Sequence, residues 1–87
     1  AIRSYSAGRL GGARAGLVWH GTLSEMGMAV IPSTIAVGQI GAALDPSGQP
    51  TGDGGAALDR GFPRLAADLE WWAEAARAQR AVRRPPY

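Results

Sequence analysis

A glycine-rich run near the start of the chain, Ser-Ala-Gly-Arg-Leu-Gly-Gly-Ala-Arg-Ala over residues 6–15, separates a short β-prone segment from a helical one. Glycine permits the sharp backbone turns that join a strand to a helix. The β-branched and aromatic residues before the run and the helical spacing after it fit that order. The run therefore predicts a tight βα turn, called the glycine turn below (residues 6–12), and an α/β fold.

The helix that follows is expected over residues 13–26. Four apolar residues recur at spacings of four, four and three, which places them on one face: Ala15, Trp19, Leu23 and Met26. Gly27 is expected to end the helix as its C′ residue. His20, the only histidine, lies off this face and is expected at the surface.

A second strand is expected over residues 28–31, a continuous apolar run typical of a parallel strand covered on both faces, and Pro32 is expected to end it. Residues 34–37 are β-branched and would form at most a short extension. Residues 38–55 are rich in Gly, Pro, Ser and Asp, which predicts an exposed loop.

The last helix is expected over residues 56–80, with a kink or restart near Phe62 because Pro63 removes a backbone donor. Its apolar residues recur at spacings of three and four and form a seam along one side of the helix: Leu58, Phe62, Leu65, Leu69, Trp72 and Ala76. Residues 81–87 form a basic, proline-containing tail.

The length of 87 residues allows one domain at most, with a marginal core. The chain has no cysteine and one histidine, so neither disulfides nor a structural zinc site is expected to support it. Two parallel strands alone bury too little and leave both sheet edges open. We therefore expect missing sequence or a partner chain to complete the fold, in an oligomer or a larger assembly.

Charge and hydropathy give little indication of other partners. The net charge of +2 does not predict nucleic-acid binding, and no apolar run is long enough to predict a membrane span. The start of the chain lacks the pattern of a secretory signal. An intracellular, soluble protein is expected.

The glycine turn is the one segment that suggests chemistry. It is expected at the carboxyl end of a strand and before a helix, where α/β sheets bind ligands. The run matches neither G-x-G-x-x-G nor a phosphate loop ending in Gly-Lys-Ser/Thr. A tight turn that needs positive φ, without a ligand, is an equal alternative.

Several motifs in order resemble the NAD(P)H-dependent FMN reductase (quinone reductase) family: the pattern Ser-x-Gly-x-x-Gly-Gly-x-Arg-Ala, then Leu-Ser-Glu-Met-Gly-Met, Ile-Pro-Ser, Ala-Leu-Asp and Asp-Leu-Glu-Trp. The resemblance extends to Gln79. It implies the C-terminal half of a flavodoxin-like parallel sheet (β-α-β-loop-α) over residues 1–80. It also implies that the flavin ring contacts the positions of Ser6, Ala7, Gly8, Arg9, Gly11 and Gly12.

The family's two other flavin loops, including its phosphate-binding turn, have no counterpart in this sequence. We therefore expect that this chain alone does not bind FMN tightly. The family transfers hydride from NAD(P)H to the flavin, and the protein positions the partners, so no catalytic residue is named. The resemblance implies part of a reductase acting on quinone or free flavin. The alternative is a non-catalytic accessory or structural subunit without flavin.

Overall fold

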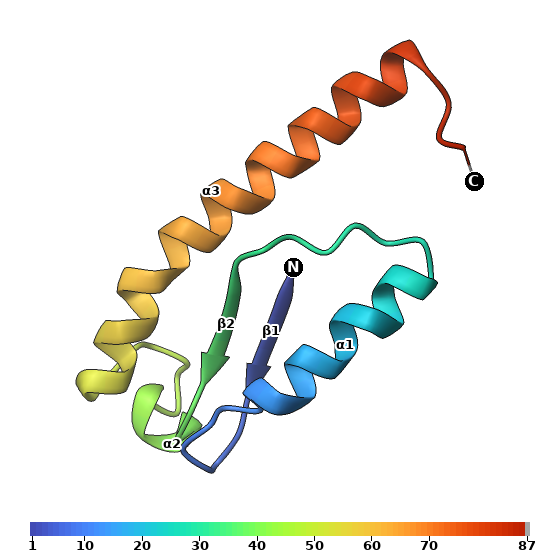
Figure 1. Cartoon of the computed structure of the whole chain (residues 1–87). Helices are drawn as coiled ribbons and strands as arrows, with labels where there is room; N and C mark the ends of the chain where they lie inside the picture. The colour runs from blue at the N-terminus through green and yellow to red at the C-terminus, as the bar shows by residue number, and fades with distance from the viewer. Residues whose placement is uncertain (87) are drawn as a thin grey trace.

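A computed structural model describes residues 1–86 as a small α/β structure, with the elements in the order strand, helix, strand, short helix, long helix. Figure 1 shows that the two strands lie side by side between α1 and α3. The elements are β1 (Ile2–Tyr5), α1 (Ala13–Glu25), β2 (Thr34–Val37), α2 (Ile40–Ala43) and α3 (Gly52–Val82). Tyr87, the end of the expected tail, lies outside the described residues.

The two strands are parallel, with Ile2 opposite Thr34 and Tyr5 opposite Val37. Side chains alternate between the faces of a sheet. A Cβ added at Gly16 of α1 would lie 3.6 Å from Cγ2 of Ile2, whereas the Arg3 guanidinium lies 5.7 Å from the centre of the Phe62 ring of α3. The two helices therefore cover opposite faces, and the α/β class expected from the sequence is confirmed.

The end of α1 follows the sequence prediction closely. Met26 is the C-cap, and Gly27 has a φ of +79°. The Gly27 N–H donates to the Ser24 carbonyl (2.9 Å), and the Met28 N–H donates to the Leu23 carbonyl (3.0 Å). This pair of bonds is a Schellman motif, which satisfies carbonyls that the helix end would otherwise leave unpaired.

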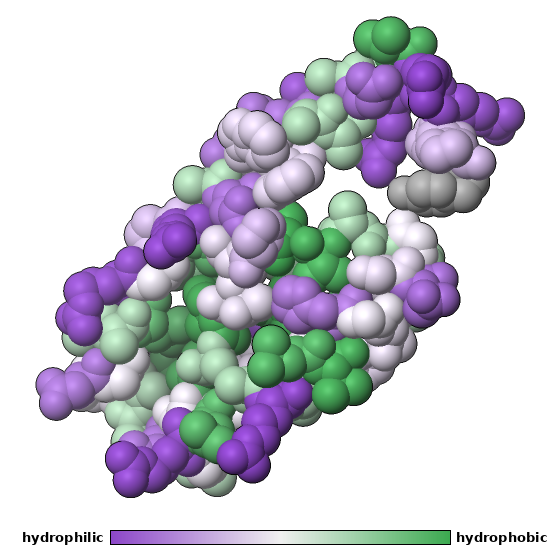
Figure 2. Space-filling view, viewed as in Figure 1, coloured by the Kyte–Doolittle hydropathy of each residue, from purple (hydrophilic) through white to green (hydrophobic). Residues whose placement is uncertain are grey.

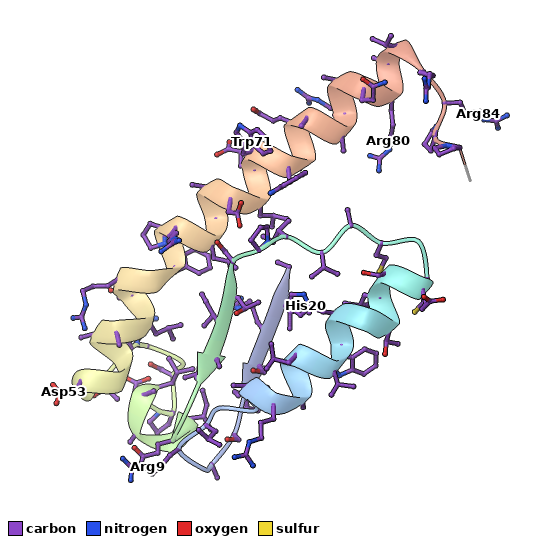
Figure 3. The ribbon with its side chains drawn as sticks, viewed as in Figure 1. Arg9, His20, Asp53, Trp71, Arg80 and Arg84 are labelled. Atoms are coloured by element: carbon purple, nitrogen blue, oxygen red, sulfur yellow. The ribbon has the colours of Figure 1, made fainter. Side chains whose placement is uncertain are left out.

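The apolar face that the sequence defines on α1 is not the face that packs on the sheet. Gly16 is the one buried residue of α1, while Trp19 and Met26 are 53% and 64% exposed. Because Gly16 has no side chain, the helix approaches β1 closely on the Gly16 side and turns the Trp19 stripe away. His20 is half-buried rather than at the surface, and Figure 3 shows it between α1 and β1.

The predicted second strand over residues 28–31 is also wrong, because the strand is formed by residues 34–37, which were expected only as an extension. A strand needs hydrogen-bonding partners, and the ladder starts with Ile2 opposite Thr34, so residues 28–31 have no β1 residue beside them. Ile31 is nevertheless buried, with 5% of its surface exposed. The apolar run of residues 28–31 therefore contributes a buried residue to the core but does not form a strand.

The region predicted as an exposed loop, residues 38–55, contains regular structure. It includes α2, a bridge between Leu44 and Pro50, and the first turn of α3. Asp45 closes the link between the helices, since its Oδ1 accepts bonds from the Ser47 N–H (2.8 Å), the Ser47 hydroxyl (2.7 Å) and the Gln49 N–H (2.9 Å). Residues 45–50 are exposed, as expected.

Helix α3 continues through Pro63, so the expected restart near Phe62 does not occur. Proline has no backbone N–H, so a helix that contains one lacks a backbone hydrogen bond at that residue. Helix α3 remains continuous despite this loss. Leu65 of the α3 seam is buried, at 4% exposed, and Phe62, Leu69 and Trp72 are 43–47% exposed. No helix within residues 1–86 combines the length and apolarity that crossing a bilayer requires.

The core of the described chain is small. Its buried apolar residues are Ile2, Ile31, Ala43 and Leu65. Figure 2 shows apolar surface gathered between α3 and α1. The large apolar residues with the most exposure include Tyr5, Leu17, Val18, Met26 and Val82. This much exposed apolar surface on a small chain is typical of a surface that another polypeptide covers.

Replacing Gly16 by alanine is expected to raise the free energy of unfolding by about 0.5–1 kcal/mol, because glycine is a poor helix former. The added Cβ would make ordinary contacts, 3.6 Å from Ile2 Cγ2 and 3.7 Å from Ser4 Oγ. Urea unfolding followed by circular dichroism measures the effect. Gly21→Ala, whose Cβ would meet nothing within 4 Å, is the control and should give a similar gain. A loss at Gly16 alone would show that α1 sits closer to β1 than described.

Asp68 joins α3 to the segment before β2 and makes the stability pH-dependent. The Ser33 N–H donates to Asp68 Oδ2 (2.9 Å), and hydrogen bonds from the Ser33 side chain and backbone lower the pKa of Asp68. A lowered folded-state pKa stabilises the fold above the unfolded value, about 4, and this contribution is lost as the pH falls through the folded value.

Between about pH 5 and pH 2, Asp68→Asn should therefore lose less stability than the unchanged chain does. Urea unfolding at several pH values measures this difference. Asp59→Asn, at an exposed position of the same helix, is the control. Parallel pH profiles for the unchanged chain and Asp68→Asn would contradict the assignment.

Candidate functional site

The glycine turn lies where the sequence placed it, between the carboxyl end of β1 and the N-terminus of α1. Ala7, Gly8 and Arg9 are exposed, Ser6 and Gly12 are half-buried, and Gly11 is buried. The six predicted site residues thus divide into an outer part that a ligand can reach and an inner part that packs on the protein.

A second loop holds the glycine turn in place. This loop, residues 37–40 at the carboxyl end of β2, is called the β2 loop below. The Ser6 N–H donates to the Val37 carbonyl (3.1 Å), and the Ile40 N–H donates back to the Ser6 carbonyl (3.1 Å). The Gln39 N–H and the Ser6 hydroxyl both donate to the Gly8 carbonyl, at 2.9 and 3.0 Å. Hydrogen bonds to the β2 loop therefore fix the conformation of the glycine turn, which follows β1.

Glycine is required inside this contact. Gly11 and Gly12 have φ values of +58° and +73°, in the left-handed region that side chains disfavour. A Cβ at Gly11 would lie 2.6 Å from the Val37 carbonyl carbon, and one at Gly38 would clash with the Arg9 carbonyl oxygen. The alternative of a turn that needs positive φ thus describes the inner part of the glycine turn.

The glycine turn contains unpaired backbone donors in both its outer and its inner part. Within residues 1–86, the backbone N–H groups of residues 7–12 make no hydrogen bond to another backbone or side-chain group. Gly12 caps α1 without a side-chain bond, and the first turn of α1 carries Arg14 and no acidic residue. Amide donors, the positive end of α1 and the Arg9 side chain therefore meet at one end of the molecule (Figure 3).

These groups suit a flat or anionic ligand, because exposed amides donate to carbonyl or phosphate oxygens and glycine lets a ring approach the backbone. A hollow of about 420 Å³ lies beside the turn on the α3 face of the sheet. Residues of β1, β2, α2 and α3 line it, and the glycine turn itself does not: Arg3, Ser4, Tyr5, Val37, Ile40, Leu44 and Leu58.

Reasoning from the sequence missed the β2 loop. Residues 38–40 were assigned to the exposed loop and Val37 to a short strand extension, although the carboxyl ends of neighbouring parallel strands meet at one edge of a sheet. Gly38, directly after the β-branched residues 34–37, was the available signal. In the described part of the chain, no three histidine or acidic side chains gather into a possible metal site.

Comparisons with protein-family models, with curated proteins and with solved structures found no match to this chain.

Proposed function

We propose that this chain is part of an NAD(P)H-dependent FMN or quinone reductase and supplies the loop that contacts the flavin ring. The observation that carries the proposal is the row of unpaired amides at residues 7–12, at the carboxyl end of a parallel strand. In a flavin enzyme such amides would donate to the oxygen and nitrogen atoms at the edge of the isoalloxazine ring. The finer fold assignment, the C-terminal half of a flavodoxin-like domain, belongs to the same proposal.

The inner and outer residues of the glycine turn have different tasks, and this difference supports the proposed role. Gly11 and Gly12 hold the turn against the β2 loop and Ser4, and this leaves Ala7, Gly8 and Arg9 exposed for the ligand. The protein would position the flavin, while FMN supplies the hydride-accepting chemistry and NAD(P)H the reducing equivalents. No side chain of the described residues needs to act as an acid or a base.

A titration with lumiflavin, which has the flavin ring and no phosphate, tests the ring contact directly. We expect the backbone amide resonances of residues 7–12 in ¹H–¹⁵N spectra to shift as lumiflavin is added. Gly8→Val should remove these shifts and keep the fold, because the added Cβ has only Ser6 Oγ nearby, at 3.7 Å. Shifts confined to other residues, or unchanged by Gly8→Val, would refute the proposal.

FMN itself is expected to bind this chain weakly, because residues 1–86 offer no second loop for the phosphate. Charge-assisted hydrogen bonds to a phosphate are among the strongest polar contacts a flavin can make. Quenching of FMN fluorescence by the purified chain measures the affinity. A submicromolar Kd would contradict the expectation.

A second function is favoured by a different observation, the exposed apolar surface of α1 and α3. In that case the chain is an accessory or structural subunit that carries no flavin and docks on other proteins. The absorbance of native material separates the two functions. A bound-flavin band supports the reductase, and colourless protein in a larger complex supports the accessory role.

A further inference from the structure

We propose that the C-terminal end of α3 holds a binding site for a ligand with a diphosphate or triphosphate group. The site is a hollow of about 210 Å³, called the arginine hollow below, which is lined by the last turns of α3 and by the segment after them. Arg80, Arg83 and Arg84 are its charged lining residues. The glycine turn lies at the other end of the molecule (Figure 1), so the site is independent of the proposed function.

Positive charge is concentrated in this part of the chain. Residues 75–87 contain four arginines and no acidic residue, while the net charge of the whole chain is only +2. The rest of the chain is therefore net negative, and the two signs of charge are separated along the molecule. A cluster of one sign raises the local concentration of ions of the opposite sign, so this end of α3 attracts anions.

The three arginines of the hollow have no hydrogen-bonded anionic partner within residues 1–86. None of their guanidinium groups donates a hydrogen bond to another residue of this part of the chain. Glu74, the last acidic residue, precedes Arg80 by six positions, whereas neighbours on a helix surface are three or four apart. Arg80 alone lies in the last turn and complements the helix dipole, so Arg83 and Arg84 have no such role in α3.

The way α3 ends brings these side chains around one hollow. Arg83, the C-cap, is extended, with a φ of −149° and a ψ of 138°. The helix does not continue, because a residue before proline is disfavoured in the α region and Arg84 precedes Pro85. The tail bends back beside the helix (Figure 1), and Pro85 and Pro86 line the same hollow as Ala76.

Figure 3 shows Arg80 on the side of α3 toward which the tail bends, and Arg84 on the tail itself. The helix and the tail thus contribute cations from two directions. The fixed φ of two successive prolines limits the conformations of the tail. The entropic cost of gathering the cations around a ligand is lower as a result.

The chemistry of the hollow favours phosphate over other anions. A guanidinium group presents its donors in a planar fork that matches the oxygens of a phosphate or a carboxylate. A carboxylate carries one negative charge, whereas a phosphate monoester carries about two at neutral pH, so linked phosphates match three guanidinium groups more closely. The other lining residues are uncharged, which leaves the arginines to select the ligand.

Calorimetric titration of the chain with sodium tripolyphosphate tests the site. The titration is done in about 150 mM NaCl, where exposed charges are screened beyond about 8 Å. We expect one ligand per chain, and the Nε–H resonances of Arg80, Arg83 and Arg84 should shift in ¹H–¹⁵N spectra. Arg80→Gln and Arg83→Gln should each weaken binding at least tenfold, because each removes charge-assisted hydrogen bonds to the phosphates.

Arg77→Gln is the matched control. Arg77 lies on the same helix, three positions before Arg80, and does not line the hollow. The substitution removes the same charge and should weaken binding less than threefold. All of these arginines are exposed, so circular dichroism and urea unfolding should show the fold retained in every variant.

The proposal is overturned if millimolar tripolyphosphate does not bind. It is also overturned if Arg77→Gln and Arg80→Gln weaken binding equally, since that result describes a diffuse attraction between charges and not a site. Hexaglutamate binding as tightly as tripolyphosphate overturns it in favour of an acidic protein segment. ADP and inorganic pyrophosphate distinguish the sources of the phosphates: tighter binding of ADP supports a nucleotide ligand, and equal binding supports an inorganic polyphosphate.

Discussion

Replacing Gly11 by alanine is expected to destabilise the chain by about 2–5 kcal/mol, enough to unfold much of so small a structure. Two costs combine at this position. A φ of +58° strains any residue with a Cβ, and that Cβ would lie 2.6–2.7 Å from the backbone of Val37 and Gly38. The glycine turn and the β2 loop would have to separate, which breaks the contact that connects the ends of both strands.

Gly8→Ala is the matched control within the same turn, because its Cβ would be 3.7 Å from Ser6 Oγ and meet nothing closer. Urea unfolding of the two variants beside the unchanged chain gives the comparison. We expect Gly8→Ala within about 0.5 kcal/mol of the unchanged chain. Equal losses at Gly8 and Gly11 would mean that the turn does not pack on the β2 loop.

Leu65→Ala is expected to cost about 2–5 kcal/mol, the range for removing a buried leucine side chain. Leu65 is 4% exposed and is the only buried side chain of the α3 seam. It is also one of the four buried apolar residues of the described chain, so the cavity would form in a core with few other members.

Leu69→Ala, one helical turn later, is the control because Leu69 is 44% exposed. Its loss of stability in the same urea experiment should be less than half that of Leu65→Ala. If both substitutions cost the same, the far half of α3 packs on something other than solvent.

The elements that the sequence predicted correctly are those determined by local chemistry. The glycine turn follows from Gly11 and Gly12, whose positive φ values only glycine adopts without strain. The end of α1 follows from Gly27 for the same reason. These residues determine the backbone within a few positions, and no distant contact is needed to recognise them.

The incorrect predictions concern contacts between distant segments. Residues 28–31 have the composition of a strand, but pairing with β1 selected residues 34–37. The apolar stripe of residues 13–26 correctly predicted the helix α1, but it did not indicate that Gly16 rather than Trp19 faces the sheet. The position of α2 depends on Gly55, whose Cβ would lie 2.7 Å from the Ala43 carbonyl oxygen.

The candidate site shows the same division. Its outer residues could be named from the glycine pattern, whereas the β2 loop that fixes them could not, because that contact joins residues about 30 positions apart. The unpaired amides could be identified only from the structure, because a sequence does not show which N–H groups a turn leaves without acceptors.

The length of helix α3 determines how far its C-terminal end moves when the helix tilts. Its 31 residues run the length of the molecule, whose longest dimension is 46 Å, and the Asp68–Ser33 bond is its last hydrogen bond to the body. The segment beyond Asp68 is a lever of about 20 Å at 1.5 Å per residue. A tilt of about 5° at that bond moves Val82 by about 2 Å. A small rearrangement where α3 meets β2 is thus amplified at the arginine-rich end, far from the glycine turn.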